Sequence, residues 1–258
     1  MLRYRKYLKR SGTRKLLHEM QEFLEAHGFQ IGRDAMFNLL AERGLLIKKR
    51  MRKGCVTTLS RHRFKKYPNI IKGFIPTAPN QLWVSDITYI RLQKRFAYLS
   101  LITDAYSHKI VGFYLSENLS AKGPLKALRM ALKSNPVITN LIHHSDRGVQ
   151  YCCDDYVMLL KDNNIKISMT ENGDPLENAI AERVNGILKT ELLEEVFYNF
   201  KMAQEATAMA CSTYNYQRPH ASIDYLKPFE AHQKSGELPK RWKNYYQIKK
   251  KKEVDMKI

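Results

Sequence analysis

The chain has 258 residues, of which 44% are hydrophobic, so a packed core is expected and global disorder is excluded. Its formal net charge of +19 is concentrated at the ends: residues 1–80 carry a net +14, residues 239–258 a net +6, and residues 81–238 a net −1. The distribution predicts nucleic-acid-binding ends around an ordinary globular domain. Basic ends that only aid solubility are the alternative.

Targeting and redox signals are few. The basic start of the chain is not followed by an apolar stretch, and no run of about 18 apolar residues occurs, so neither a secretory signal nor a membrane span is expected. The cysteines show no C-x-x-C spacing, which favours free thiols in a reducing cytoplasm over a disulfide framework or a zinc finger.

Two short helices are expected near the N-terminus. Residues 13–27 place apolar side chains on one side of a helix that Gly28 can end. Asp34 can cap a second helix that ends at Gly44. With the basic run that follows, this pattern predicts a helix-turn-helix-like DNA-binding domain over residues 1–54. A helical hairpin that only packs is the alternative. The candidate DNA contacts in the basic run are Lys48, Lys49, Arg50, Arg52 and Lys53.

Residues 55–80 contain Pro68, Gly73, Pro76 and Pro79, and are expected to form a basic linker. A catalytic core is predicted over residues 81–232. Residues 233–258 are expected to form a basic C-terminal tail that becomes ordered on DNA, if at all.

The core region contains three strand-like runs separated by short polar turns, which predict an antiparallel meander. Helices and strands then alternate. The expected elements are strands at 82–91, 96–103 and 109–116, a helix at 121–134, a strand at 138–143, a helix at 150–162, a strand at 165–169, a loop at 170–177, and helices at 177–197 and 201–216. This order favours an α/β fold of the ribonuclease-H-like type, a mixed five-stranded sheet with flanking helices.

Three acidic residues stand out within these elements. Asp86 interrupts an apolar run expected to be a central strand, where a lone buried carboxylate is costly unless it is paired or binds metal. Asp146 follows the fourth strand, and Glu182, 36 positions later, lies on the polar side of a helix, facing a groove or solvent. Taken singly, each residue has an alternative: a salt bridge or a capping role for Asp86, a plain turn for Asp146, and a solvated helix face for Glu182.

Together the three carboxylates predict a catalytic metal site. Carboxylates are hard oxygen ligands that suit Mg²⁺, with Mn²⁺ as an alternative. Two such ions about 3.5–4 Å apart can activate a nucleophile and stabilise a leaving 3′ oxygen. Because no nucleophilic side chain is needed, His143 and His144 are interpreted as structural residues or as supports for the ligands. Asp104, at the end of the second strand, is a rival ligand.

Four runs of sequence carry a family resemblance. They are WVSDITYI, HHSDRGVQY, ENAIAERVNGILKTEL and YNYQRPHASIDYLKP, at residues 83–90, 143–151, 177–192 and 214–228. They resemble the integrase-like core of insertion-sequence transposases with a D-D-E triad. The closer similarity is to the group whose transposase is split between two overlapping reading frames, with this chain resembling the second-frame product.

The resemblance implies that Asp86 bridges both metal ions and that Asp146 and Glu182 each hold one. It also implies that Asn178 orients the start of the helix. Lys189 is placed to meet a terminal phosphate of the element, with a solvated lysine as the alternative. Asn185, on the same polar side, is a second candidate DNA contact. Arg218 and His220 match a motif whose role stays open between packing and DNA contact.

The predicted function is that of a DNA transposase. Metal-activated water nicks one strand at an element end, and the freed 3′ hydroxyl attacks another phosphodiester, at the other end or in target DNA. The implied partners are double-stranded DNA, further copies of the chain on DNA, and the upstream-frame protein or a frameshift fusion with it. The expected location is the bacterial cytoplasm, at the nucleoid.

The predicted function has three rivals. A non-catalytic DNA-binding regulator derived from a transposase is one, and a ribonuclease-H-like nuclease is another. A retroviral-type integrase is disfavoured because the upstream zinc-binding His/Cys module is missing.

Overall fold

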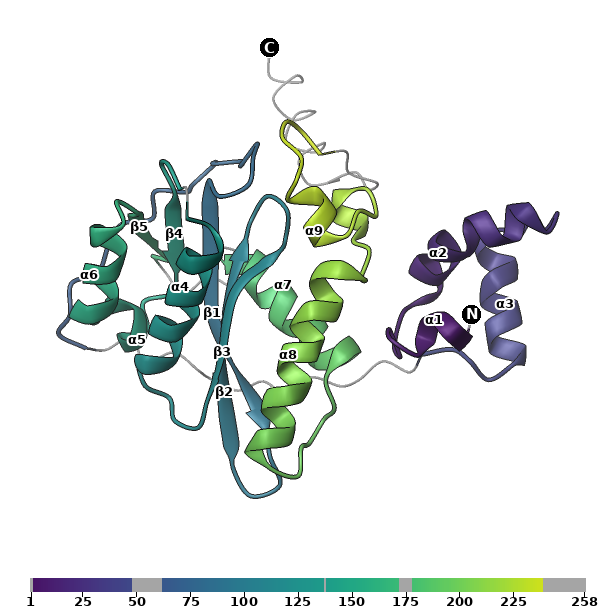
Figure 1. The fold of residues 1–258 in the computed structure, drawn as a ribbon, viewed down its shortest axis with the longest axis horizontal. Helices are drawn as coiled ribbons and strands as arrows, with labels where there is room; N and C mark the ends of the chain where they lie inside the picture. Colours follow the sequence, from purple (N-terminus) through teal and green to yellow (C-terminus); the bar gives the residue numbers. More distant parts are fainter. Residues whose placement is uncertain (1, 48–61, 137, 172–177, 239–258) are drawn as a thin grey trace, which may run out of the picture.

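The computed structural model describes residues 2–47, 62–136, 138–171 and 178–238 (Figure 1). The basic run at Lys48–Lys53 and the tail beyond residue 238 therefore lie outside the described residues. Within the described part, no helix is long and apolar enough to cross a membrane, and Cys152, Cys153 and Cys211 are free.

The N-terminal part is helical, as predicted. Its helices are α1 (Leu2–Arg5), α2 (Thr13–Ala26) and α3 (Arg33–Glu42), and α2 and α3 pack through Leu16, Met36 and Leu40. Gly28 and Gly44 follow the ends of α2 and α3 with φ of +72° and +62°, the left-handed geometry that commonly ends helices. The prediction that Asp34 caps α3 is wrong. Gly32 is the N-cap, and Asp34 lies in the first turn, where it accepts a hydrogen bond from Arg33.

The predicted mixed five-stranded sheet is confirmed. Its strands are β1 (Leu82–Arg91), β2 (Phe96–Asp104), β3 (Ile110–Ser116), β4 (Ile142–Ser145) and β5 (Lys166–Met169). The order is β3-β2-β1-β4-β5, with β1–β2 and β2–β3 antiparallel and β1–β4 and β4–β5 parallel. The strand that carries Asp86 is therefore central, as its apolar run indicates.

Helices cover both faces of the sheet (Figure 1). One face packs on α4 (Lys122–Ser134), α5 (Val149–Cys152) and α6 (Asp154–Asp162) through a core that includes Trp83, Leu128 and Tyr156. The other face packs on α7 (Ala179–Ile187), a π-helix η2 (Leu188–Leu192) and α8 (Phe200–Tyr216). A 3-10 helix η3 (Ala221–Ile223) and α9 (Pro228–Ala231) follow.

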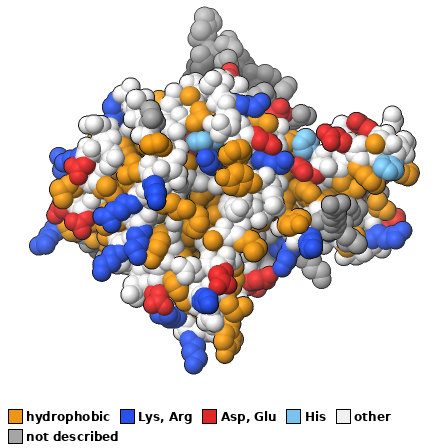
Figure 2. Space-filling model, in the orientation of Figure 1, with side chains coloured by type: hydrophobic (Ala, Val, Ile, Leu, Met, Phe, Trp, Pro, Cys, Tyr) orange, Lys and Arg blue, Asp and Glu red, His pale blue; other side chains and the backbone are white. Residues whose placement is uncertain are grey.

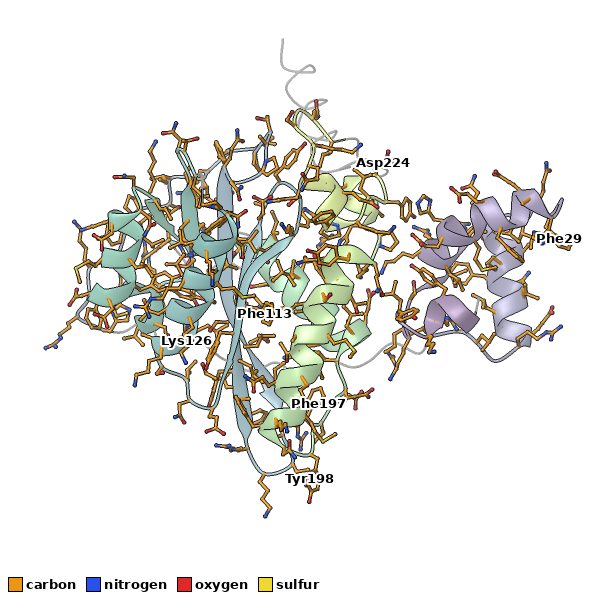
Figure 3. The ribbon with its side chains drawn as sticks, in the orientation of Figure 1. Phe29, Phe113, Lys126, Phe197, Tyr198 and Asp224 are labelled. Atoms are coloured by element: carbon orange, nitrogen blue, oxygen red, sulfur yellow. The ribbon has the colours of Figure 1, made fainter. Side chains whose placement is uncertain are left out.

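Three predicted elements have different bounds. The expected helix at 150–162 is broken at Cys153, which is extended. The fourth strand starts at Ile142 rather than at residue 138 and continues to Ser145. The expected helix at 177–197 ends at residue 192, because the chain turns extended and Phe197 pairs with Leu92 at the end of β1, near the bottom of Figure 3.

The helical N-terminal part is docked on the core. Lys15 of α2 forms an ion pair of 2.9 Å with Glu191 of η2, and His18 stacks on Tyr225 at a ring-centroid distance of 4.4 Å. The face shown in Figure 2 has basic and acidic side chains interspersed over the core, which agrees with the near-neutral charge of residues 81–238.

Candidate active site

Asp86 lies on the face of β1 that α7 covers. Side chains alternate along a strand, so Asp86 shares its face with Val84 and Thr88. Val84 packs in a small cluster with Ala181 of α7. The Asp86 side chain is half-buried, and its Oδ2 accepts a hydrogen bond of 2.7 Å from Nδ2 of Asn185.

Asp146 directly follows β4, the parallel neighbour of β1. The register pairs Val84 with His144, so Asp146 comes level with Asp86 along the two strands. Its Oδ1 accepts a hydrogen bond of 2.9 Å from the backbone amide of Gly148. A Cβ on Gly148 would approach that oxygen to 3.0 Å, so a glycine at this position lets the loop close on the carboxylate.

Glu182 is exposed in the first turn of α7. The helix is held against β1 by Asn178, whose Nδ2 donates a hydrogen bond of 2.9 Å to the backbone oxygen of Ser85, next to Asp86. The Asn178 side chain makes no capping hydrogen bond to its own helix. It therefore fixes the start of α7 by its hydrogen bond to β1.

The polar side of α7 faces β1. Besides Asn178 and Asn185, Lys189 of η2 reaches the strand, its Nζ lying 3.3 Å from Oγ1 of Thr88. The expectation that this side of the helix faces away from the core is therefore wrong for Asn185, which is buried. Asn185 lies one turn after the exposed Glu182 on the same helix side, so its spacing alone gave no sign of its burial.

Electrostatics connect the three carboxylates. The pKa of Asp86 is raised to about 7, first by burial and then by the negative charge of Asp146, with a smaller contribution from Glu182. The hydrogen bond from Asn185 acts in the opposite direction and lowers the pKa. Both other carboxylates thus lie near enough to act on Asp86.

A metal ion would suit these donors chemically. Two acidic neighbours make the ionised form of Asp86 unfavourable, and a divalent cation would remove that penalty. Among the described residues, however, no three His, Cys, Asp or Glu side chains form a cluster that could hold a metal ion. The three carboxylates are thus close enough to influence one another electrostatically, but their side chains are not arranged as a ready-made set of metal ligands.

The two histidines beside Asp146 are part of the core. His143 Nε2 lies 2.7 Å from Oγ of Ser85 and 2.9 Å from the hydroxyl of Tyr156, and burial lowers the pKa of His143 to about 3. His144 Nδ1 lies 2.8 Å from Oγ of Ser168. Both are fully covered, so they support the strands behind the site.

Asp104, the rival ligand, has a structural role. Asp104 of β2 pairs with Trp83 of β1. Trp83 precedes Asp86 by three residues, so Asp104 lies away from the level of Asp86 along the strand. Its oxygens accept hydrogen bonds from the backbone amides of Asn80 and Ser107 and from the Ser107 hydroxyl. It therefore holds the turn after β2.

Arg218 and His220 lie in the packing between α8 and η2. Both are buried. The Arg218 guanidinium donates hydrogen bonds of 3.0 and 2.8 Å to the two oxygens of Glu191, and its Nη1 lies 2.9 Å from Nε2 of His220. Glu191 was not singled out from the sequence, although it is the acceptor for both Arg218 and Lys15.

Comparison with known families gives the class of the protein. Residues 76–175 match the family model described as Integrase core domain, and residues 163–228 match a second model with the same description. These spans include every strand of the sheet and the three acidic residues. The integrase core indicates a polynucleotidyl transferase.

Whole-chain relatives define the family. The chain is 38% identical over 222 residues to the insertion element IS600 uncharacterized 31 kDa protein of Shigella sonnei, covering 84% of this chain and 79% of that protein. It is 30% identical over 224 residues to the transposase for insertion sequence element IS629 of Shigella sonnei, covering 85% and 73%. The chain belongs to the insertion-sequence transposase family, whose function is DNA transposition.

A solved structure supports the fold. The chain aligns with a chain in the solved structure of the simian T-cell lymphotropic virus intasome in complex with PP2A regulatory subunit B56 gamma. The TM-score is 0.53 at 18% identity, and the alignment covers 89% of this chain and 78% of that one. At this identity the likeness concerns the fold alone, and it agrees with the ribonuclease-H-like sheet.

Proposed function

We propose that this transposase cleaves and joins DNA strands with divalent metal ions held by Asp86, Asp146 and Glu182. The observation that carries the proposal is geometric: Asp86 on the central strand lies level with Asp146 at the end of the neighbouring parallel strand, and α7, which carries Glu182, is bonded to Asp86 through Asn185. The raised pKa of Asp86 agrees with this arrangement. Two Mg²⁺ ions, or Mn²⁺, would supply Lewis acidity to the attacking oxygen and to the leaving 3′ oxygen.

The residues of the chain have distinct parts in this proposal. Asp86, on the central strand, would bind both ions, while Asp146 and Glu182 would bind one each. Asn185 orients the Asp86 carboxylate through its 2.7 Å hydrogen bond. Lys189, on the same side of the helix, would meet a phosphate of the element end.

The DNA chemistry follows the two steps expected of the family. Water attacks a phosphodiester at an element end, which leaves a 5′ phosphate on one side and a 3′ hydroxyl on the other. That 3′ hydroxyl then attacks a second phosphodiester, at the other end or in target DNA, and displaces the 3′ oxygen of the attacked strand as a new 3′ hydroxyl. We further propose that the chain acts in the bacterial cytoplasm as an oligomer on DNA, and that an upstream-frame segment supplies recognition of the ends. The isolated chain should then bind element ends weakly, and a nanomolar sequence-specific complex would contradict this part.

Carboxylate substitutions test the assignment. The substrate is a labelled duplex carrying the inverted repeat beside the coding region, incubated with Mg²⁺ and with either this chain or its frameshift fusion. Asp86→Asn, Asp146→Asn and Glu182→Gln should each abolish cleavage and joining while leaving DNA binding mostly intact. The exposed residues Asp155 and Glu205 provide matched controls, and Asp155→Asn and Glu205→Gln should remain active.

The same assay separates the other functions. A non-catalytic regulator would bind the duplex without cleaving it, and a ribonuclease-H-like nuclease would prefer an RNA–DNA hybrid. Near-normal activity of any of the three carboxylate variants would refute the triad.

A further inference from the structure

The segment at residues 62–67, within the predicted linker, is attached to the core beside the Asp146 loop. Phe64 and Tyr67 are partly buried and pack against the core that α4, α5 and α6 form with the sheet. His62 Nε2 donates a hydrogen bond of 2.9 Å to the backbone oxygen of Arg147, the residue after Asp146. Three contacts thus fix the segment beside a candidate catalytic carboxylate.

Further contacts hold the chain beyond this point. The backbone amide of Met169 in β5 donates a hydrogen bond of 3.3 Å to the oxygen of Pro68, and the amide of Ile70 donates one of 3.1 Å to Oγ of Ser168. The chain at residues 68–70, directly after the segment, therefore lies along the edge strand of the sheet. It is a docked part of the core surface rather than a loose spacer.

The positively charged side chains of this segment point to solvent. Arg63, Lys65 and Lys66 are exposed, while His62, Phe64 and Tyr67 of the same segment are half-buried. We call these three cations the linker strip. No ion pair within the described part of the chain uses any of them, whereas the exposed Lys72 pairs with Glu171.

The linker strip lies in the electrostatic neighbourhood of the site. The thiol of Cys152 has its pKa raised to about 11, first by burial and then by Asp146, and Lys66 opposes this shift. Lys66 and Asp146 thus act on one buried group, from the segment and from the loop that His62 joins.

We propose that the linker strip binds the phosphodiester backbone of the DNA strand that enters the candidate active site. This proposal rests on the proposed function, because the proposed active site defines where the DNA strand enters. Residues 63 to 66 can span at most about 10 Å, which is roughly the rise of three phosphates of one strand along the duplex axis, at about 3.4 Å each. Cations at this place would also offset the repulsion between phosphates and the carboxylates.

A salt titration of DNA binding tests the proposal without metal and without chemistry. The variant is Arg63→Ala/Lys65→Ala/Lys66→Ala, and the probe is the labelled inverted-repeat duplex in EDTA. Loss of three phosphate contacts should make the slope of log K against log [salt] shallower by about 2.7. Because the three side chains are exposed, the melting temperature should not change.

A matched control removes the same charge elsewhere. Arg91 and Lys94, at the far end of β1, and Lys201, at the start of α8, are exposed. Arg91→Ala/Lys94→Ala/Lys201→Ala should leave the slope within about one unit of the wild-type value. If the slope became equally shallow in both variants, the proposal would be overturned, because the effect would then come from net charge.

A second variant keeps the charge and removes the anchors. Phe64→Ala/Tyr67→Ala should also make the slope shallower, because the cations are no longer held beside the Asp146 loop. An unchanged slope in the variant that lacks the three cations would show that the strip does not bind DNA, even if the carboxylate variants lose cleavage. Conversely, a shallower slope together with active carboxylate variants would refute the proposed function and leave the strip as a DNA-binding site.

Discussion

The Nδ2 group of Asn185 donates a hydrogen bond of 2.7 Å to Oδ2 of Asp86, which joins α7 to the central strand at the candidate site. This bond favours the ionised carboxylate and lowers the pKa of Asp86 against the effects of burial and of Asp146. A metal ligand must be ionised, so the bond helps to keep Asp86 ready to bind an ion near neutral pH.

Asn185→Ala should therefore shift the pH dependence of cleavage. Without the donor, the pKa of Asp86 rises above about 7, so the acidic limb of the pH–rate profile should move upward by about one pH unit. Activity should fall about fivefold at pH 7, because the ionised fraction of Asp86 falls from about one half to about one tenth, and should recover largely at pH 8.5. Initial cleavage rates between pH 6 and 9 provide the measurement, and an equal loss at every pH would indicate a purely structural role.

The stability of the metal-free protein should depend on the charge of Asp86. The pKa is about 7 in the folded state and about 3.9 in the unfolded chain, so ionisation is opposed by the fold. The contribution of Asp86 to the free energy of unfolding is therefore fully present below about pH 4, and it is lost as pH rises through 7.

Asp86→Asn should remove this part of the pH dependence. In EDTA, its melting temperature should exceed that of the wild type by a few degrees at pH 8 and match it near pH 4. Adding Mg²⁺ at pH 8 should stabilise the wild type alone. Thermal denaturation at the two pH values is the measurement, and parallel pH curves for the two proteins would contradict the shift.

Glu191→Gln should destabilise the protein strongly. Arg218 is only 5% exposed at its side chain, and Glu191 is its acceptor as well as that of Lys15. Removing the acidic partner leaves buried positive charge uncompensated, at a cost of about 3–5 kcal/mol. Chemical denaturation measures this cost, and Glu117→Gln, from an exposed ion pair with Arg95, should cost less than about 1 kcal/mol.

Gly112→Ala should be among the more damaging small substitutions. A Cβ at this position of β3 would lie 2.2 Å from the backbone oxygen of Ala127 in α4, so the helix would have to move away from the sheet. The expected cost is about 3 kcal/mol or more. At Gly123 the Cβ would meet the Ser116 hydroxyl at 2.6 Å, which can rotate, so Gly123→Ala should cost less in the same denaturation experiment.

Sequence patterns predicted the central elements of the fold well. The apolar run around Asp86 identified the central strand, and the order of elements identified the mixed sheet, because both depend on local periodicity and connection length. The bounds of β4 and the end of the helix after Glu182 were less predictable. They depend on pairing with distant segments, such as Phe197 with Leu92.

The surroundings of the site were also hard to predict. Helical periodicity separated an apolar from a polar side of α7, but it could not show that the polar side packs against β1. Asn185 was therefore expected at the surface, although it binds Asp86. Likewise, Phe64 and Tyr67 within a basic, proline-rich segment were the only local indication that the segment packs on the core.

The backbone amide of Gly236 donates a hydrogen bond of 2.8 Å to the oxygen of Thr77, and the hydroxyl of Tyr106 reaches the oxygen of Gly236 at 3.0 Å. The polypeptide thus enters and leaves the sheet-containing body at neighbouring points. Such a body can be spliced between different flanking modules without rearranging its interior. Flanking modules that recognise DNA can therefore be exchanged during evolution without a change in the candidate catalytic residues.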